Sequence, residues 1–114
     1  MQSCIFCRII EGKVNSHIVF EDDEIIAFKD ISPQAPTHFL IVSQKHISTV
    51  NHLEQSDDRL IGKMFLVAKS LARKENIHES GYRLVMNCNG DGGQSVYHIH
   101  LHLLGGRRMR WPPG

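Results

Sequence analysis

The spacing of apolar residues predicts two helices separated by strands. Residues 4–12, "CIFCRIIEG", form a short amphipathic stretch that Gly12 is expected to end. Residues 57–77 place Leu, Ile, Met, Phe and Ala side chains at helical intervals, which predicts a long helix with one apolar stripe. Its acidic start and basic later part suit the helix dipole.

Runs of apolar and β-branched residues between turn signals predict five strands. The predicted strands are a hairpin at residues 17–30, a mostly apolar central strand at residues 38–45, and two further strands at residues 82–89 and 96–104. A glycine-rich loop, "GDGGQS", joins the last two. The pattern therefore predicts an α+β domain, in which one long and one short helix pack on one face of an antiparallel five-stranded sheet.

Length and charge limit the classes of protein to which this chain can belong. A chain of 114 residues is the size of one domain, so residues 1–114 are expected to fold as a single unit. A formal net charge of +1 gives no bias toward nucleic acid or a membrane surface. No apolar run approaches the roughly 20 residues that span a bilayer, and no signal peptide is visible. Three cysteines, an odd count, favour reduced thiols and a cytoplasmic location.

The stretch "GGQSVYHIHLHLLGG" concentrates the candidate chemistry. Alternation on a strand would place His98, His100 and His102 on one face and leave Ile99, Leu101 and Leu103 to pack under the long helix. A zinc hydrolase would use such a row as metal ligands. A nucleophile or general base held by its neighbours is the second interpretation, and a merely histidine-rich polar face is the third. The preceding "NGDGGQS" can turn several backbone N–H groups toward one anion, which favours a phosphate site.

The motif "CIFC" near the N-terminus also has three interpretations. A redox pair would fit a thioredoxin-like βαβ context, which the pattern does not show. Two buried thiols on one helix are the simplest alternative. Half of a zinc site with two cysteines and two histidines is the third.

Taken together, "DISPQAPTHFLIV" and "GYRLVMNCNGDGGQSVYHIHLHLLGGRRMRWPPG" resemble the Hint branch of the histidine-triad (HIT) superfamily, the purine nucleoside phosphoramidases. The resemblance runs from Cys4 to Gly114. It implies a homodimer whose sheet continues across the interface. It also implies hydrolysis of adenosine 5′-phosphoramidates and of aminoacyl or lysyl adenylates to AMP, through a nucleotidyl-histidine intermediate.

The resemblance assigns a role to each catalytic candidate. His100 matches the nucleophile, and His102 matches the residue that hydrogen-bonds the phosphoryl oxygens. His98 and His38 match the residues that orient the nucleophile through a hydrogen-bond relay. Ser95 matches the group beside the leaving atom. A neutral imidazole nitrogen is a competent nucleophile near neutral pH, which agrees with these roles.

The resemblance also implies the substrate contacts. Asp30 matches the acceptor of the ribose hydroxyls, while Asn87 and Gln94 match phosphate-side contacts. The residues that match the apolar walls around the base are Ile5, Phe6, Ile9, Phe28 and Ile31. Some of these residues have an alternative role: Asp30 as a loop cap, Asn87 as a backbone partner at a strand end, and Ile5, Phe6 and Ile9 as core residues of the short helix.

Two further implications concern the metal and the tail. Some HIT relatives bind zinc through positions that match Cys4, Cys7, His46 and His98, while others lack the cysteines, so a structural zinc is expected and no cofactor is expected to be required for the chemistry. The ending "RRMRWPPG" is similar to C-termini that lie near the partner subunit's active site, which places Trp111 there.

The prediction is therefore a cytoplasmic Hint-type homodimer that hydrolyses purine nucleoside phosphoramidates through His100. Its ligands are purine nucleotides, and neither nucleic acid nor a membrane is an expected partner. A nucleotide-binding regulatory module with incidental turnover is the alternative function.

Overall fold

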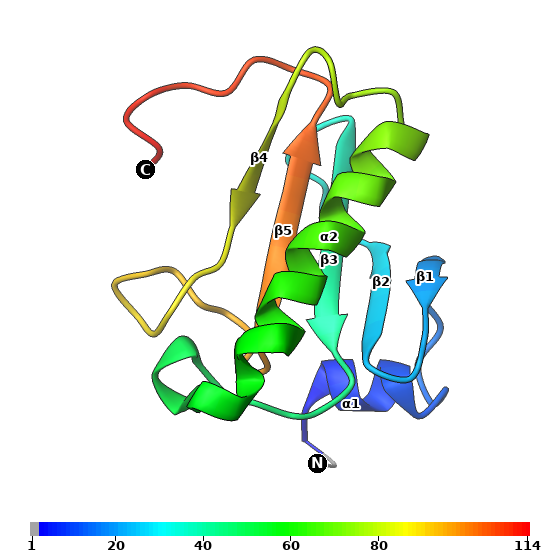
Figure 1. Ribbon diagram of the computed structural model, residues 1–114, viewed down its shortest axis with the longest axis vertical. Coiled ribbons are helices and arrows are strands. Elements are labelled where there is room, and N and C mark those ends of the chain that lie inside the picture. The colour runs from blue at the N-terminus through cyan, green and yellow to red at the C-terminus, as the bar shows by residue number, and fades with distance from the viewer. Residues whose placement is uncertain (1–2) are drawn as a thin grey trace.

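The computed structural model describes residues 3–114 as a five-stranded antiparallel sheet with two α-helices (Figure 1). The strands lie in the order β1-β2-β3-β5-β4, so β3 and β5 are flanked on both sides. The helices are α1 (Ile5–Ile10) and α2 (Asp58–Lys74), and the strands are β1 (Ile18–Glu21), β2 (Ile25–Lys29), β3 (Thr37–Ser43), β4 (Tyr82–Val85) and β5 (His100–Gly105). The predicted α+β class, the hairpin and the central third strand are confirmed. No helix in residues 3–114 has the length and apolar character needed to cross a membrane.

One face of the sheet packs against α2. Alternate residues of β2, β3 and β5 join the buried side chains of α2 in a single core cluster. Ile99, Leu101 and Leu103 belong to this cluster, as the alternation predicted. In Figure 1, α2 crosses the front of the sheet along β3 and β5. This layer holds the strand that carries His100 and His102 rigidly in place.

The opposite face of the sheet packs against α1. Phe6 and Ile9 of this helix form a second core cluster with the other set of alternate residues of β2 and β3. The members on the strands are Ile26, Phe28, Leu40 and Val42. The expectation that both helices pack on one face is therefore wrong. The short helix can cover the second face because that face is also apolar along β2 and β3.

Local signals set the ends of both helices. Gly12, with φ of +77°, follows the last turn of α1 and ends that helix as predicted. Asp57 precedes α2, where its carboxylate accepts the backbone N–H of Glu54 at 2.9 Å and pairs with Lys45. Asn76, with φ of +60°, follows the end of α2.

Two predicted strands are shorter in the structure. The fourth ends at Val85 instead of residue 89, and the chain then turns at Asn89, whose φ is +60°. The fifth begins at His100 instead of residue 96, because the N–H of Ile99 bonds to the backbone oxygen of Ile47, a loop residue, at 2.8 Å. His98 therefore lies before the strand, and the prediction that three histidines alternate along one strand is wrong for His98.

Candidate functional site

A cavity of about 300 Å³ opens on the α1 side of the sheet. The predicted site residues that line it are Ile5, Phe6, Ile9, Phe28, Asp30, Ile31, Ser95, His100 and His102. Phe6, Ile9 and Phe28 are buried and form its inner wall, whereas the side chain of Ile31 is almost fully exposed at its mouth. The cavity thus combines an apolar wall with a polar end that carries two imidazoles.

Strand register explains why the cavity crosses the sheet. His102 lies opposite Leu40, Leu40 opposite Phe28, and Phe28 opposite Ile18. Residues opposite one another in an antiparallel sheet project to the same face, so these four form one row across β5, β3, β2 and β1. The row places the imidazoles at one end and the edge strand β1 at the other, separated by three strand spacings, or about 14 Å.

His100 has one nitrogen free for chemistry. Its Nδ1 lies 2.8 Å from the backbone oxygen of His98, and because that oxygen can only accept, Nδ1 carries the proton. The Nε2 lone pair is then unprotonated. Burial lowers the pKa of His100, so the ring is neutral at physiological pH. The Phe6 ring packs against the His100 ring in a T-shaped arrangement, with 5.0 Å between centroids, which holds the orientation of the imidazole.

His38 and His102 form a directed hydrogen-bond chain. The backbone N–H of Gln34 donates to Nδ1 of His38 at 3.0 Å, which places the His38 proton on Nε2. That Nε2–H donates to Nδ1 of His102 at 2.9 Å, so His102 keeps its own proton on Nε2. Burial lowers the pKa of His102 to about 4. The chain therefore leaves a neutral His102 with an N–H available as a donor beside His100, whose ring centroid lies 4.9 Å away.

Asp30 lies at the mouth of the cavity with one oxygen engaged. Its Oδ1 accepts the backbone N–H of Ser32 at 2.8 Å, as a loop-capping carboxylate does. Its Oδ2 lies 3.5 Å from Nε2 of His38. The predicted ribose contact and the alternative role as a loop cap are compatible, because each can use a different oxygen.

Three predicted contacts lie away from the cavity lining. The Gln94 amide donates to the backbone oxygens of Ser48 and Val96 and accepts from the N–H of Asn89, so it holds the glycine-rich loop. Asn87 lies two residues beyond β4 and is not part of the lining. Trp111 is 81% exposed and lies over the Arg83 guanidinium, 6.0 Å from ring centroid to Cζ.

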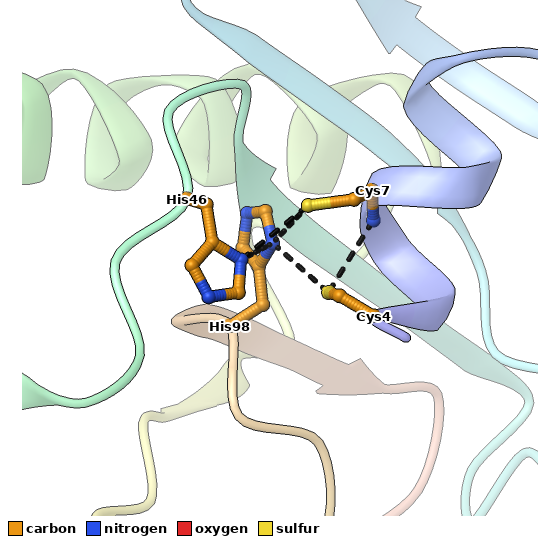
Figure 2. A group of neighbouring side chains, drawn as sticks. All are labelled: Cys4, Cys7, His46 and His98. Atoms are coloured by element: carbon orange, nitrogen blue, oxygen red, sulfur yellow. Dashed lines mark hydrogen bonds between the residues drawn. The ribbon is translucent and has the colours of Figure 1, made fainter. Parts of the chain in front are cut away.

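Cys4, Cys7, His46 and His98 converge beside the start of α1 (Figure 2). The two cysteines come from the start of α1, His46 from the loop after β3, and His98 from the segment before β5. Nδ1 of His98 lies 3.4 Å from Sγ of Cys4, 3.6 Å from Sγ of Cys7 and 3.1 Å from Nδ1 of His46. Nδ1 of His46 lies 3.4 Å from Sγ of Cys7.

These separations fit one tetrahedral ion. Zinc at about 2.05 Å from nitrogen and about 2.3 Å from sulfur separates two nitrogens by about 3.3 Å, and a nitrogen from a sulfur by about 3.6 Å. The backbone oxygen of Ser43 accepts Nε2–H of His98 at 2.6 Å, which leaves Nδ1 unprotonated and aimed at the group. Burial lowers the pKa of His98 to about 4, so its ring is neutral, as a ligand must be.

Asp30, His38 and His102 form a second cluster of possible metal ligands. Here the hydrogen bonds oppose a metal. The Gln34 N–H occupies Nδ1 of His38, so Nε2 carries a proton and cannot ligate while that bond stands. Only the Cys₂His₂ group is therefore arranged to hold a metal ion among residues 3–114.

Several residues of the site were not among the predictions. The cavity is also lined by Val14, Asn15, Ser16, Lys29, Leu40 and Val96. Leu40 could have been found from register, since it lies opposite His102 on the neighbouring strand. Residues 14–16 form a loop before β1 and carry no pattern that links them to the histidines. Gln34 and Ser43 act through backbone groups, which side-chain motifs do not reveal.

Comparisons with known proteins agree with this geometry. Residues 3–110 match the family model described as "Scavenger mRNA decapping enzyme C-term binding". The chain is 52% identical over 108 residues to the purine nucleoside phosphoramidases of Escherichia coli K12 and Shigella flexneri, covering 95% of this chain and 91% of each relative.

Solved structures show the same fold. The HIT family hydrolase of Legionella pneumophila superposes with a TM-score of 0.96 at 55% identity, covering 98% of this chain and 100% of that one. The HIT family hydrolase of Clostridium thermocellum superposes with a TM-score of 0.93 at 41% identity, covering 96% of both chains. With the imidazole pair on β5 and these similarities over nearly its whole length, the chain belongs to the histidine-triad (HIT) family of hydrolases.

Proposed function

We propose that this protein hydrolyses purine nucleoside 5′-phosphoramidates, and aminoacyl or lysyl adenylates, to the nucleoside monophosphate. The observation that carries the proposal is the tautomer of His100, which leaves a neutral, unprotonated Nε2 in a cavity of nucleotide size. The relatives named purine nucleoside phosphoramidase support the choice of substrate.

In the first step, Nε2 of His100 attacks the phosphorus and the P–N bond breaks. The leaving nitrogen takes a proton from water and departs as an amine, and the nucleotide is joined to His100 through an N–P bond. In an aminoacyl or lysyl adenylate, the P–O bond to the acyl group breaks instead and the carboxylate departs. Attack makes the imidazole cationic. The backbone oxygen of His98 stabilises that charge through the bond it already accepts from Nδ1–H.

In the second step, water attacks the phosphorus of the intermediate. The bond between phosphorus and Nε2 breaks, the nucleoside monophosphate leaves with the oxygen of water, and His100 returns to its neutral form. The imidazole is a good leaving group because the proton on Nδ1 is retained throughout. His100 therefore starts and ends each cycle in the same tautomer.

His102 serves the phosphoryl group in both steps. Its Nε2–H is the free donor of the His38–His102 chain, and it is placed to hydrogen-bond a phosphoryl oxygen as negative charge develops there. His38 is a positioning residue that fixes this donor. Ser95 lies in the lining of the same cavity and is assigned to the leaving nitrogen.

The remaining residues bind the nucleoside. Oδ2 of Asp30 accepts hydrogen bonds from the ribose hydroxyls, while Phe6, Ile9 and Phe28 enclose the base in an apolar slot. Ile5 and Ile31 are partly and almost fully exposed at the mouth, where a bound base would cover them. In this assignment, Asn87 and Gln94 act on the phosphate side through the glycine-rich loop that Gln94 anchors.

The Cys₂His₂ group is assigned a structural zinc. Four protein ligands fill a tetrahedral ion and leave no position for a reactive water, which is typical of structural zinc sites and opposes a zinc-hydrolase mechanism. Cys4, Cys7, His46 and His98 would hold the ion. The ion would tie α1, a wall of the cavity, to the residue whose backbone oxygen orients His100. Zinc supplies folding stability here and takes no part in the reaction.

The functional unit is assigned as a cytoplasmic homodimer. β4 is an edge strand along which a second sheet can add, and all three cysteines, Cys4, Cys7 and Cys88, are free thiols. In a dimer built through this edge, the C-terminal tail with Trp111 would lie close to the partner's cavity. The equilibrium mass in solution by sedimentation tests this assignment.

Incubation of the purified protein with adenosine 5′-phosphoramidate tests the proposed function. We expect stoichiometric release of AMP and amine, with turnover retained after mild chelation while the protein stays folded. Tight AMP binding without turnover would instead support the nucleotide-binding regulatory module. Loss of turnover that returns only with added metal, with the fold intact throughout, would support the zinc-hydrolase mechanism.

A further inference from the structure

The cavity has a second polar end, far from the imidazoles. The cross-strand row runs from His102 through Leu40 and Phe28 to the edge strand β1. Val14, Asn15 and Ser16, in the loop that leads into β1, line the cavity here together with Lys29 at the end of β2. With the phosphate at His100 and His102, a nucleotide extended along this row places its base toward residues 14–16.

Asn15 differs from the other groups that enclose the base. The inner wall is apolar and contacts any base equally well, because every base has a similar aromatic face. Asn15 is exposed, lines the cavity, and makes no side-chain hydrogen bond within residues 3–114. Its amide offers a donor and an acceptor side by side, both available to a ligand.

We propose that Asn15 is a specificity-determining residue that reads the edge of the base and selects adenine. Adenine presents a donor beside an acceptor on both accessible edges, since the 6-amino group lies next to N7 on one side and N1 on the other. On the same two edges, guanine offers such a pair only at O6 and N1, because O6 and N7 are both acceptors. The Asn15 amide therefore pairs with adenine whichever edge it meets. This inference rests on the proposed function, because it uses the nucleotide orientation set by His100 and His102.

Ser16 is the neighbouring alternative. It is less exposed than Asn15 and lines the same end of the cavity. A hydroxyl rotates to donate or to accept, so it accommodates an amino group and a carbonyl equally and discriminates weakly. The two-point match of the amide makes Asn15 the stronger determinant.

A double-mutant cycle between side chain and ligand tests the proposal. Binding of AMP and of purine riboside 5′-monophosphate, which lacks the 6-amino group, is measured by calorimetry for the wild type and Asn15→Ala. We expect the wild type to bind AMP about 5-fold or more tightly than the analogue, within the range of a pair of neutral hydrogen bonds. In Asn15→Ala the two affinities should become equal within about 2-fold.

Matched variants make the result specific to Asn15. Asn51→Ala removes another exposed amide outside the cavity lining and should keep the wild-type ratio of the two affinities. Equal ratios in the wild type and Asn15→Ala would overturn the proposal, as would GMP binding at least as tightly as AMP. Collapse of the ratio in Ser16→Ala but not in Asn15→Ala would assign the role to Ser16 instead.

Neither monophosphate is hydrolysed, so the cycle is independent of turnover. Absence of phosphoramidate hydrolysis with an intact coupling to the 6-amino group would remove the proposed reaction and leave Asn15 as the base reader. Hydrolysis without this coupling would keep the proposed reaction and remove Asn15 as the base reader. Melting temperatures of the Asn15, Ser16 and Asn51 variants confirm that each is folded before its affinities are compared.

Discussion

Two pairs of buried or half-buried imidazoles lie on either side of His100 and have opposite arrangements. His46 and His98 turn their Nδ1 atoms toward two thiols, and their group fits a tetrahedral ion. His38 and His102 lie 2.9 Å apart in a donor-to-acceptor chain that ends in a free N–H. Both pairs are deprotonated by burial, which lowers the pKa of all four histidines. Burial and residue type therefore do not explain the difference.

The backbone partners of the histidines explain the difference between the two pairs. A carbonyl oxygen, that of Ser43, accepts from Nε2 of His98 and so forces Nδ1 to be the ligand atom. An amide N–H, that of Gln34, donates to Nδ1 of His38 and so forces Nε2 to be a donor. The same side chain becomes a metal ligand or a proton-bearing group according to which backbone atom it meets. Predictions on the two groups should therefore separate cleanly.

The largest expected effect is at His100, which stands between the two groups. His100→Ala should lower kcat for adenosine 5′-phosphoramidate by at least about 10³-fold, since only binding and electrostatic stabilisation remain. Single-turnover kinetics and AMP binding by calorimetry measure the two parts separately. AMP affinity should stay within about 5-fold of the wild type. More than about a tenth of wild-type turnover would rule out His100 as the nucleophile.

Periodicity predicted the sheet and helices well because burial imposes it directly. The long helix and the third strand carry unbroken apolar patterns, and both were found within a few residues of their predicted bounds. Ile99, Leu101 and Leu103 pack against α2 as predicted. These features depend on local spacing, which a single sequence displays.

The position of His98 could not be predicted in this way. Alternation placed it on the strand, but the N–H of Ile99 bonds to the loop residue Ile47 and His98 lies outside the ladder. The metal-binding group and the role of Gln34 likewise depend on loops that meet only in the folded chain. The resemblance to HIT proteins indicated the four Cys and His positions, whereas spacing alone left three interpretations of "CIFC" open.

Removing the thiols should break the metal-binding group alone. Protein purified without chelator should contain close to one zinc per subunit. Cys4→Ser combined with Cys7→Ser should lose it and lower the melting temperature by about 10 °C or more, since metal binding is linked to folding. Metal analysis and thermal unfolding provide the measurements. Cys88→Ser is the matched control and should keep both zinc and stability, because Cys88 is not part of the group.

Zinc-free wild-type protein with an unchanged melting temperature would mean that the thiols serve only as packing. A double-serine variant that retains the metal would point to other ligands.

Lowering the pH should reveal the contribution of the His38–His102 pair to stability, through the protonation of His102. Its pKa is about 4 in the folded protein because of burial, with smaller contributions from His100, His38 and Asp30, and about 6.5 in the unfolded chain. Between these values the unfolded chain binds the extra proton and the folded protein does not, so stability falls as pH drops from about 6.5 to about 4. The melting temperature of His102→Gln should therefore fall less across this window than that of the wild type. The same substitution at exposed His17 is the matched control for the loss of one imidazole. Equal slopes for His102→Gln and the wild type would show that His102 does not titrate as described.

The smallest expected effect comes from substituting one histidine of each group, His38 of the hydrogen-bond chain and His46 of the metal-binding group. His38→Ala removes the donor that fixes the His102 tautomer, so kcat should fall about 10-fold while zinc content stays the same, an effect of the size seen when a positioning hydrogen bond is lost. His46→Ala should lose zinc and have a lower melting temperature. At a temperature where this variant is folded, its kcat should change less than that of His38→Ala. His38→Gln should recover part of the lost turnover, because an amide N–H can still donate to Nδ1 of His102. A purely structural role for His38 predicts instead that the Gln and Ala variants have equal turnover when their stabilities are equal. Steady-state kinetics, metal analysis and thermal unfolding on the three variants decide the matter. If His38→Ala lost zinc, or if His46→Ala lost turnover as strongly as His38→Ala while still folded, the two groups would be one coupled unit and the division by backbone partner would be wrong.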